Sequence, residues 1–168
     1  MKITVIVIYI LTAGLASAQS VYNQPIISIG STSVFYVKDS LINEGIIVNN
    51  GDMQAGGSWI NNNQYEAGQG QITFNSDLPQ IINHNDQSFS KLTISGGGEK
   101  IFLANITIEN KLNLSEGVLV SKNNSRIIFN SIAEMIGGSD QSHIQGAVYH
   151  KGQAAKFSLL ETDHSICR

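Results

Sequence analysis

The residues that could carry catalysis are spread singly along this chain of 168 residues. Hydrolysis of a glycosidic bond needs two neighbouring carboxyl groups, and a polysaccharide lyase needs a cationic side chain near the acidic proton of the sugar. The carboxylates stand apart in the sequence, as in Asp52, Glu66, Asp77 and Asp86. The only arginine before residue 158 is Arg126, which lies beside the apolar stretch Ile127-Ile128-Phe129. The pattern therefore predicts no catalytic residues and no enzyme.

The sequence also lacks the spacing of a metal site. Zinc sites need three or four converging ligands, and no short ligand spacing links His84, His143, His150 and His164. Asn83-His84-Asn85-Asp86 and Ser139-Asp140 offer oxygen atoms, but without the alternating acidic residues of a calcium loop. Gly96-Gly97-Gly98 lacks the strand-to-helix setting of a phosphate loop, and we expect it to form an exposed turn with Glu99-Lys100. We interpret these segments as turns and predict no metal and no cofactor.

Two interpretations are open for the aromatic residues of the middle of the chain. Trp59 and Tyr65, with Phe89, could form a face on which sugar rings stack. Alternatively, Trp59 and Phe89 fill the core, where aromatic side chains contribute the largest buried areas. Core filling is the simpler interpretation. In the other interpretation, the residues that stack on a sugar ring are Trp59 and Tyr65.

The elements that must position all these residues are short strands. Apolar residues recur at alternate positions, with Ile72 and Phe74 around Thr73. This alternation places one set of side chains on one face of a strand. Asn, Gly, Ser and Asp separate the apolar pairs and supply turns. A motif over residues 48–56 recurs twelve residues later over 60–68, and short repeats of this kind are stabilised by stacking.

We therefore predict an all-β fold, a parallel β-solenoid over residues 26–157. Asn at a corner would stack on Asn of the next turn and bond to its backbone. A β-sandwich gives a similar alternation and is the alternative.

The first residues have the features of an export signal. Lys2 supplies the charge, Ile3–Leu11 is apolar, and a small-residue cleavage site precedes Gln19. We expect residues 1–18 to be a signal peptide cleaved between Ala18 and Gln19, with 19–25 as a flexible lead. The apolar run is shorter than the roughly 20 residues of a spanning helix. The mature chain is expected not to span a membrane and to be secreted or held at the cell surface.

Charge and cysteine content exclude some classes of protein. The net charge is −3 and charged residues make up 14% of the chain, so no basic patch exists to bind nucleic acid. Cys167 is the only cysteine, which excludes an internal disulfide. The partner is unknown, with surface glycans and surface proteins as the two classes open.

From Gly57 onward the order of several short motifs is informative. They are Gly57-Ser58-Trp59-Ile60-Asn61, Gly68-Gln69-Gly70-Gln71-Ile72-Thr73-Phe74-Asn75, Gln80-Ile81-Ile82, Phe89-Ser90-Lys91-Leu92-Thr93-Ile94 and Leu112-Asn113-Leu114-Ser115-Glu116-Gly117-Val118-Leu119. In this order they resemble the repeat regions of large secreted and surface proteins of the Bacteroidetes. The resemblance implies a β-solenoid, export through the type IX system and an adhesin-like role. Such proteins end in a sorting domain, and we see none in this chain.

The end of the chain departs from that pattern. Where relatives continue with Phe-Pro-x-Gly-x-Gly and Phe-Tyr-x-Pro, this chain has its own residues 158–168. Codons for these residues can be chosen so that the neighbouring frame reads Phe-Pro-Thr-Gly-Asn-Gly-Pro-Phe-Tyr-Leu-Pro. We therefore expect 158–168 to be an out-of-frame tail, produced by a frameshift near Phe157 or Ser158 that truncates a longer protein.

The predicted function is a non-catalytic structural, adhesin-like segment of a secreted surface protein, acting as a spacer or contact surface. The alternative is a carbohydrate-binding or polysaccharide-degrading β-solenoid.

Overall fold

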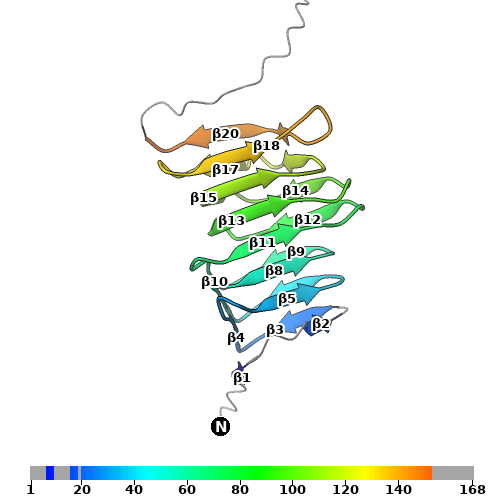
Figure 1. The fold of residues 1–168 in the computed structure, drawn as a ribbon, viewed down its shortest axis with the longest axis vertical. Helices are drawn as coiled ribbons and strands as arrows, with labels where there is room; N and C mark the ends of the chain where they lie inside the picture. Colours follow the sequence, from blue (N-terminus) through cyan, green and yellow to red (C-terminus); the bar gives the residue numbers. More distant parts are fainter. Residues whose placement is uncertain (1–6, 10–15, 19, 153–168) are drawn as a thin grey trace, which may run out of the picture.

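The computed structural model describes residues 7–9, 16–18 and 20–152. The chain winds into a parallel β-solenoid of about six turns, and its strands stack along the long axis of the molecule (Figure 1). No helix occurs in the described residues. The predicted all-β solenoid is confirmed. The sandwich alternative is wrong, because sandwich sheets are antiparallel whereas every pair of named strands described here is parallel.

The strands form three sheets, which we call A, B and C, and the strands after β10 belong to sheets B and C alone. Sheet A contains β1 (Val7–Tyr9), β4 (Ile26–Ile29), β7 (Ile46–Asn49) and β10 (Gln64–Glu66). Sheet C contains β3 (Val21–Asn23), β6 (Leu41–Asn43), β9 (Trp59–Asn61), β12 (Gln80–Asn83), β14 (Lys100–Phe102), β16 (Leu119–Ser121) and β19 (Ile144–Gln145). The strands of sheet C are short, so most present a single residue outward between two inward ones.

Sheet B is the largest of the three. It contains β2 (Ala16–Ala18), β5 (Val34–Val37), β8 (Asp52–Ala55), β11 (Gln71–Phe74), β13 (Ser88–Ile94), β15 (Ile106–Leu114), β17 (Arg126–Phe129), β18 (Glu134–Gly137) and β20 (Ala147–His150). The long β15 serves two neighbours: Ile106–Ile108 pair with β17, and Lys111–Leu114 pair with β18.

The register stacks like side chains on one another. Ile72 pairs with Met53 below and Leu92 above, and all three are buried. Thr73 pairs with Gln54 and Thr93, on the outer face of the same strands. The alternation in the sequence therefore becomes one continuous apolar core with a polar outer face on sheet B.

Asparagines form the predicted corner ladder at the end of sheet C. Asn23 Nδ2 donates to Asn43 Oδ1 at 2.6 Å, and Asn43 Nδ2 donates to Asn61 Oδ1 at 2.6 Å. Asn43 also donates to the backbone oxygen of Gln64 at 3.1 Å. All three side chains are buried, so each needs these partners. The prediction of stacked, backbone-bonded asparagines is confirmed.

The N-terminal part of the chain contains more strand than expected. The segment 19–25 was expected to be a flexible lead, but it includes β3, which pairs in parallel with β6. Residues 21–23 are therefore not a flexible lead, because Asn23 is the first member of the asparagine ladder. Within the expected signal peptide, β1 pairs with β4 and β2 with β5. Gln19 and the expected tail 158–168 lie outside the described residues.

Candidate functional site

The two residues considered for sugar stacking lie in the core. Trp59 is 0% exposed and Tyr65 is 7% exposed. Their rings pack edge to face, with centroids 5.7 Å apart, and Phe89 packs against both. In this conformation neither ring offers a face to a sugar. The structure therefore corresponds to the core interpretation of these aromatic residues.

His84 is the polar centre of this aromatic cluster, and its 0% exposure was not predicted by the interpretation of Asn83-His84-Asn85-Asp86 as a turn. Trp59 Nε1 donates to His84 Nδ1 at 3.0 Å, which assigns the ring proton to Nε2. Nε2 then donates to the backbone oxygen of Ser88 at 3.3 Å. Phe89 stacks on the imidazole with centroids 3.8 Å apart. Burial lowers the pKa of His84 to about 3, so the ring is neutral and shielded from any dissolved substrate.

Glu99-Lys100 was expected to lie in an exposed turn, but Lys100 is buried. Its side chain is 0% exposed, and Nζ donates to the backbone oxygens of Ser76 at 2.8 Å, Gly96 at 3.2 Å and Gly98 at 2.7 Å. Burial lowers the pKa of Lys100 to about 8, and the charges of Asp77 and Glu116 oppose that shift. The ammonium group therefore stabilises this corner, and its three donors are all used by backbone oxygens.

Gln80 has the equivalent role at the corner of the preceding turn, where it pairs with Lys100. Its Nε2 donates to the backbone oxygens of Ala55 at 2.9 Å and Gly57 at 2.6 Å. Its Oε1 accepts from the backbone N–H of Ser76 at 3.0 Å. Two polar side chains thus replace apolar ones in a buried column, and both are satisfied by backbone groups.

A polar hollow of about 250 Å³ lies at the corner between the strands of sheet C and the strands that follow them. It is lined by Asp86, Leu103, Ala104, Asn105, Asn123, Asn124 and Ser125. Its cause is a difference in turn length: the turn over 103–105 is one residue shorter than the turns over 84–87 and 122–125. The short turn is the floor, and its longer neighbours are the walls.

The walls of the hollow hold unusual backbone conformations. Asp86 has φ of 55°, and Asn123 and Asn124 have φ of 55° and 59°. Asp and Asn tolerate this left-handed region better than other residues that carry a side chain. Asp86 Oδ1 accepts from the backbone N–H of Asn105 at 3.0 Å, and Asn105 Oδ1 accepts from that of Arg126 at 2.9 Å. Each turn therefore caps the next.

The chemistry available in the hollow is hydrogen bonding. Asp86 is its only ionisable side chain, so it has no second carboxylate to act as a partner acid or base. The side-chain amides of Asn123 and Asn124 form no hydrogen bond within the described part of the chain. These amides can bind a hydroxyl-bearing ligand, but the hollow has no nucleophile paired with a base.

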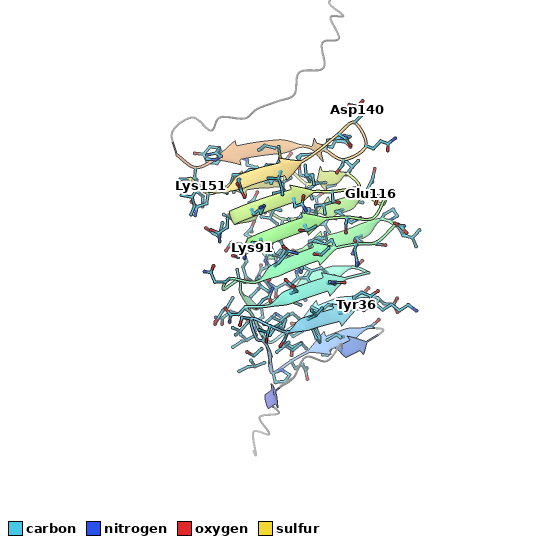
Figure 2. The ribbon with its side chains drawn as sticks, viewed as in Figure 1. Tyr36, Lys91, Glu116, Asp140 and Lys151 are labelled. Carbon is cyan, nitrogen blue, oxygen red and sulfur yellow. The ribbon has the colours of Figure 1, made fainter. Side chains whose placement is uncertain are left out.

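The other candidate residues are dispersed. Figure 2 shows Lys91, Glu116 and Asp140 at separate positions along the stack. Asp140 is exposed, in a loop closed by the Ser139–Ser142 bridge, and Arg126 is exposed. Residues 7–9, 16–18 and 20–152 contain no group of three or more His, Cys, Asp or Glu that could hold a metal ion. His164 and Cys167 lie outside the described residues.

The outer faces of the sheets differ in polarity. On sheet B the outward column contains Gln54, Thr73, Thr93 and Asn113. On sheet C the outward column begins with Tyr22, Ile42 and Ile60, of which Tyr22 is 60% exposed and Ile42 is 36% exposed. Parallel strands that are apolar on both faces are usually covered on both. The outer face of sheet C is therefore more apolar than that of sheet B at these positions.

Among the described residues, no helix has the length and apolar character to cross a membrane. Comparison with protein-family models, with curated proteins and with solved structures finds no match to this chain.

Proposed function

We propose that this chain is a non-catalytic structural segment of a secreted bacterial surface protein, and that it acts as a spacer and contact surface in an adhesin-like role. The observation that carries this proposal is the use of the buried polar side chains. Asn43, Lys100 and His84 all form hydrogen bonds with partners on a neighbouring turn. Side chains held in this way stiffen a stack of turns and are themselves inaccessible to a dissolved substrate.

The dimensions of the stack suit a spacer. Parallel strands lie about 4.8 Å apart, so six turns span roughly 29 Å along the axis. The turn-to-turn ladder and the continuous core run the length of the described solenoid. A rod of this kind holds whatever is attached at its two ends at a fixed separation.

The outer face of sheet C supplies a reason to propose contact as well as spacing. Its outward column is apolar over three successive turns, at Tyr22, Ile42 and Ile60. Exposed apolar patches on otherwise polar surfaces commonly mark interaction sites. A surface protein is the class of partner that such a face would suit.

The proposal is tested with a panel of soluble polysaccharides and a search for cleavage. We expect no new reducing ends and no unsaturated products above the level of a buffer blank. Product formation that scales with protein concentration and persists after repurification would contradict the non-catalytic assignment. Export is tested separately by mass spectrometry of the secreted chain, with a mature N-terminus at Gln19 as the expected result.

The polar hollow favours carbohydrate binding as a second candidate function. The free amides of Asn123 and Asn124 are suited to sugar hydroxyl groups, and the volume is below the roughly 300–1,000 Å³ of typical ligand pockets, so one sugar residue would fit best. Asn124→Gly keeps the left-handed backbone and removes the amide. Asn85→Gly is the matched control, because Asn85 has φ of 53° but does not line the hollow.

Ligand-observed NMR with a panel of monosaccharides separates the two functions. Saturable binding that Asn124→Gly abolishes and Asn85→Gly preserves would support a carbohydrate site. Absence of saturable binding, or equal effects of the two variants, would exclude this hollow as the site.

A further inference from the structure

The apolar column on the outer face of sheet C continues beyond β9. Asn83 of β12 pairs with Ile60, and Ile81 lies two residues earlier on that strand, so it faces the same way. Ile81 is 37% exposed, and it pairs with Ile101 of β14. The column therefore extends over five successive strands, from β3 to β14, and is about 19 Å long at 4.8 Å per strand.

The outward columns of the other two sheets are interrupted sooner. On sheet A, Ile26 and Ile46 are followed by Gln64. On sheet B, Ile136 follows the polar Asn113. Parallel sheets that are apolar on both faces are usually covered by helices. Sheet C is therefore the face of the described solenoid that a helix would suit best.

A row of carboxylates lies beside the apolar column, at the corner where the chain passes from sheet B to sheet C. Figure 2 shows Glu116 and Asp140 along the same side of the stack. Lys38 is the one exposed lysine or arginine in the described links from sheet B to sheet C. The exposed carboxylates in these links belong to Asp39, Asp77, Glu99, Glu116 and Asp140.

The carboxylates and the column are close because the links are short. Asp39 comes three residues before Ile42, and Glu99 comes two residues before Ile101. An extended chain rises about 3.3 Å per residue, so the backbone separation is at most about 7–10 Å. The outer face of sheet C therefore has an apolar centre and an acidic margin.

Building on the contact role proposed above, we propose that this face binds a basic amphipathic helix of a partner protein. Apolar side chains of the helix cover the column, and lysines or arginines along one flank of the helix lie against the carboxylates. A helix of about 13 residues has the length of the column.

The acidic margin decides between possible occupants. A second copy of this chain would bring the same row of carboxylates, which supplies no complementary charge. An anionic lipid surface attracts basic segments and repels carboxylates. A basic helix is the occupant that matches both the apolar column and its margin.

Fluorescence anisotropy of a labelled synthetic peptide, measured with the full chain, tests the proposal. The probe is an 18-residue helical peptide whose leucines form one stripe and whose lysines lie along one flank of that stripe. We expect saturable binding. A matched peptide with glutamate in place of lysine should bind at least about tenfold more weakly, because like charges then meet at the margin.

A pair of isoleucine substitutions tests the apolar column. Ile42→Thr with Ile81→Thr should weaken binding by at least about tenfold, because they remove apolar burial from the contact. Threonine is also favoured in strands, so the fold should be kept, and circular dichroism checks this. The control is Ile26→Thr with Ile136→Thr, outward residues of sheets A and B that are 37% and 40% exposed. It should bind like the wild type.

A second pair of substitutions tests the acidic margin. Asp39→Asn with Glu99→Gln should weaken binding and reduce its dependence on salt, because screening acts on the charge contacts. The control is Asp52→Asn with Glu66→Gln, which removes the same charge from exposed positions on sheets B and A. It should bind like the wild type, with the same salt dependence.

Three results would overturn the proposal. They are the absence of saturable binding of the lysine peptide up to about 1 mM, equal binding of the two peptides, and equal effects of a pair and its control. Sedimentation velocity supplies a fourth: a wild-type dimer that Ile42→Thr with Ile81→Thr dissociates would show that a second copy occupies the face. The cleavage assay judges the non-catalytic assignment separately, so the two proposals can fail independently.

Discussion

Trp59 and His84 meet where the asparagine ladder of sheet C ends. The pairing of Asn83 with Ile60 brings His84 level with Asn61, so the imidazole takes the position that the next asparagine would occupy. His84 accepts from Trp59 Nε1 at 3.0 Å and stacks on Phe89. A polar ladder therefore passes into an aromatic cluster without interrupting the core.

Stability should fall in acid because His84 is held neutral. The pKa of His84 is about 3 in the folded chain, against 6.5 for the free side chain. Between these values the unfolded chain binds the extra proton, so the free energy of unfolding falls as pH falls from 6.5 toward 3, by up to about 1.4 kcal/mol per pH unit. His84→Gln should flatten this part of the profile. Urea unfolding at several pH values between 7 and 4 measures the effect.

The control for His84 is His143→Gln, since His143 is exposed. It should leave the acid dependence of stability as in the wild type. An unchanged slope in His84→Gln would show that other groups cause the acid sensitivity.

Lys100 should produce the same trend at alkaline pH. Its pKa is about 8 in the folded chain, against 10.5 for the free side chain. Between these values the unfolded chain again binds more protons, so this residue makes stability rise with pH. Lys100→Met should remove that component and also cost about 1–3 kcal/mol at pH 7, because backbone oxygens lose their donor. Thermal unfolding from pH 7 to 10 compares the two proteins.

Lys122→Met provides the comparison for Lys100→Met, because Lys122 is exposed. The two variants should differ both in stability at pH 7 and in its slope with pH. Indistinguishable profiles would contradict the role assigned to the buried ammonium group.

The asparagine ladder should contribute measurably to stability. Asn43→Ala removes the donor to Asn61 Oδ1 and the acceptor of Asn23 Nδ2, so buried polar groups lose their partners. We expect a loss of about 2–3 kcal/mol in the free energy of unfolding. Asn113→Ala, on the outer face of sheet B, should change it by less than about 0.5 kcal/mol. Urea denaturation measures both, and equal losses would show that the ladder adds nothing.

The sequence predicts the solenoid well where strands are long enough to show alternation. In β11 the residues around Thr73 alternate between inward and outward positions, and their register with β13 follows the same period. The corner asparagines were also predictable, because Asn tolerates tight turns and its amide can bond both to the backbone and to a stacked neighbour. These features depend on local pattern alone.

The features that could not be predicted depend on neighbouring turns. Lys100 resembles any lysine after a glycine turn, and only the converging oxygens of Ser76, Gly96 and Gly98 make its burial possible. The hollow depends on the relative lengths of three turns far apart in the chain. β3 is three residues long, too short for a periodic signal, and its pairing with β6 is a tertiary contact.

Strands about 20 residues apart in the chain are parallel and in register, and disulfide formation tests this register most directly. Thr73 and Thr93 are paired neighbours on the outer face, and paired strands lie about 4.8 Å apart, within the roughly 4.4–6.8 Å range that suits a disulfide. In a Cys167→Ser background, Thr73→Cys with Thr93→Cys should oxidise to an intramolecular disulfide. Thr73→Cys with Asn113→Cys, two strands apart, should not. Cross-linking of the second pair, or failure of the first, would contradict the stacked register.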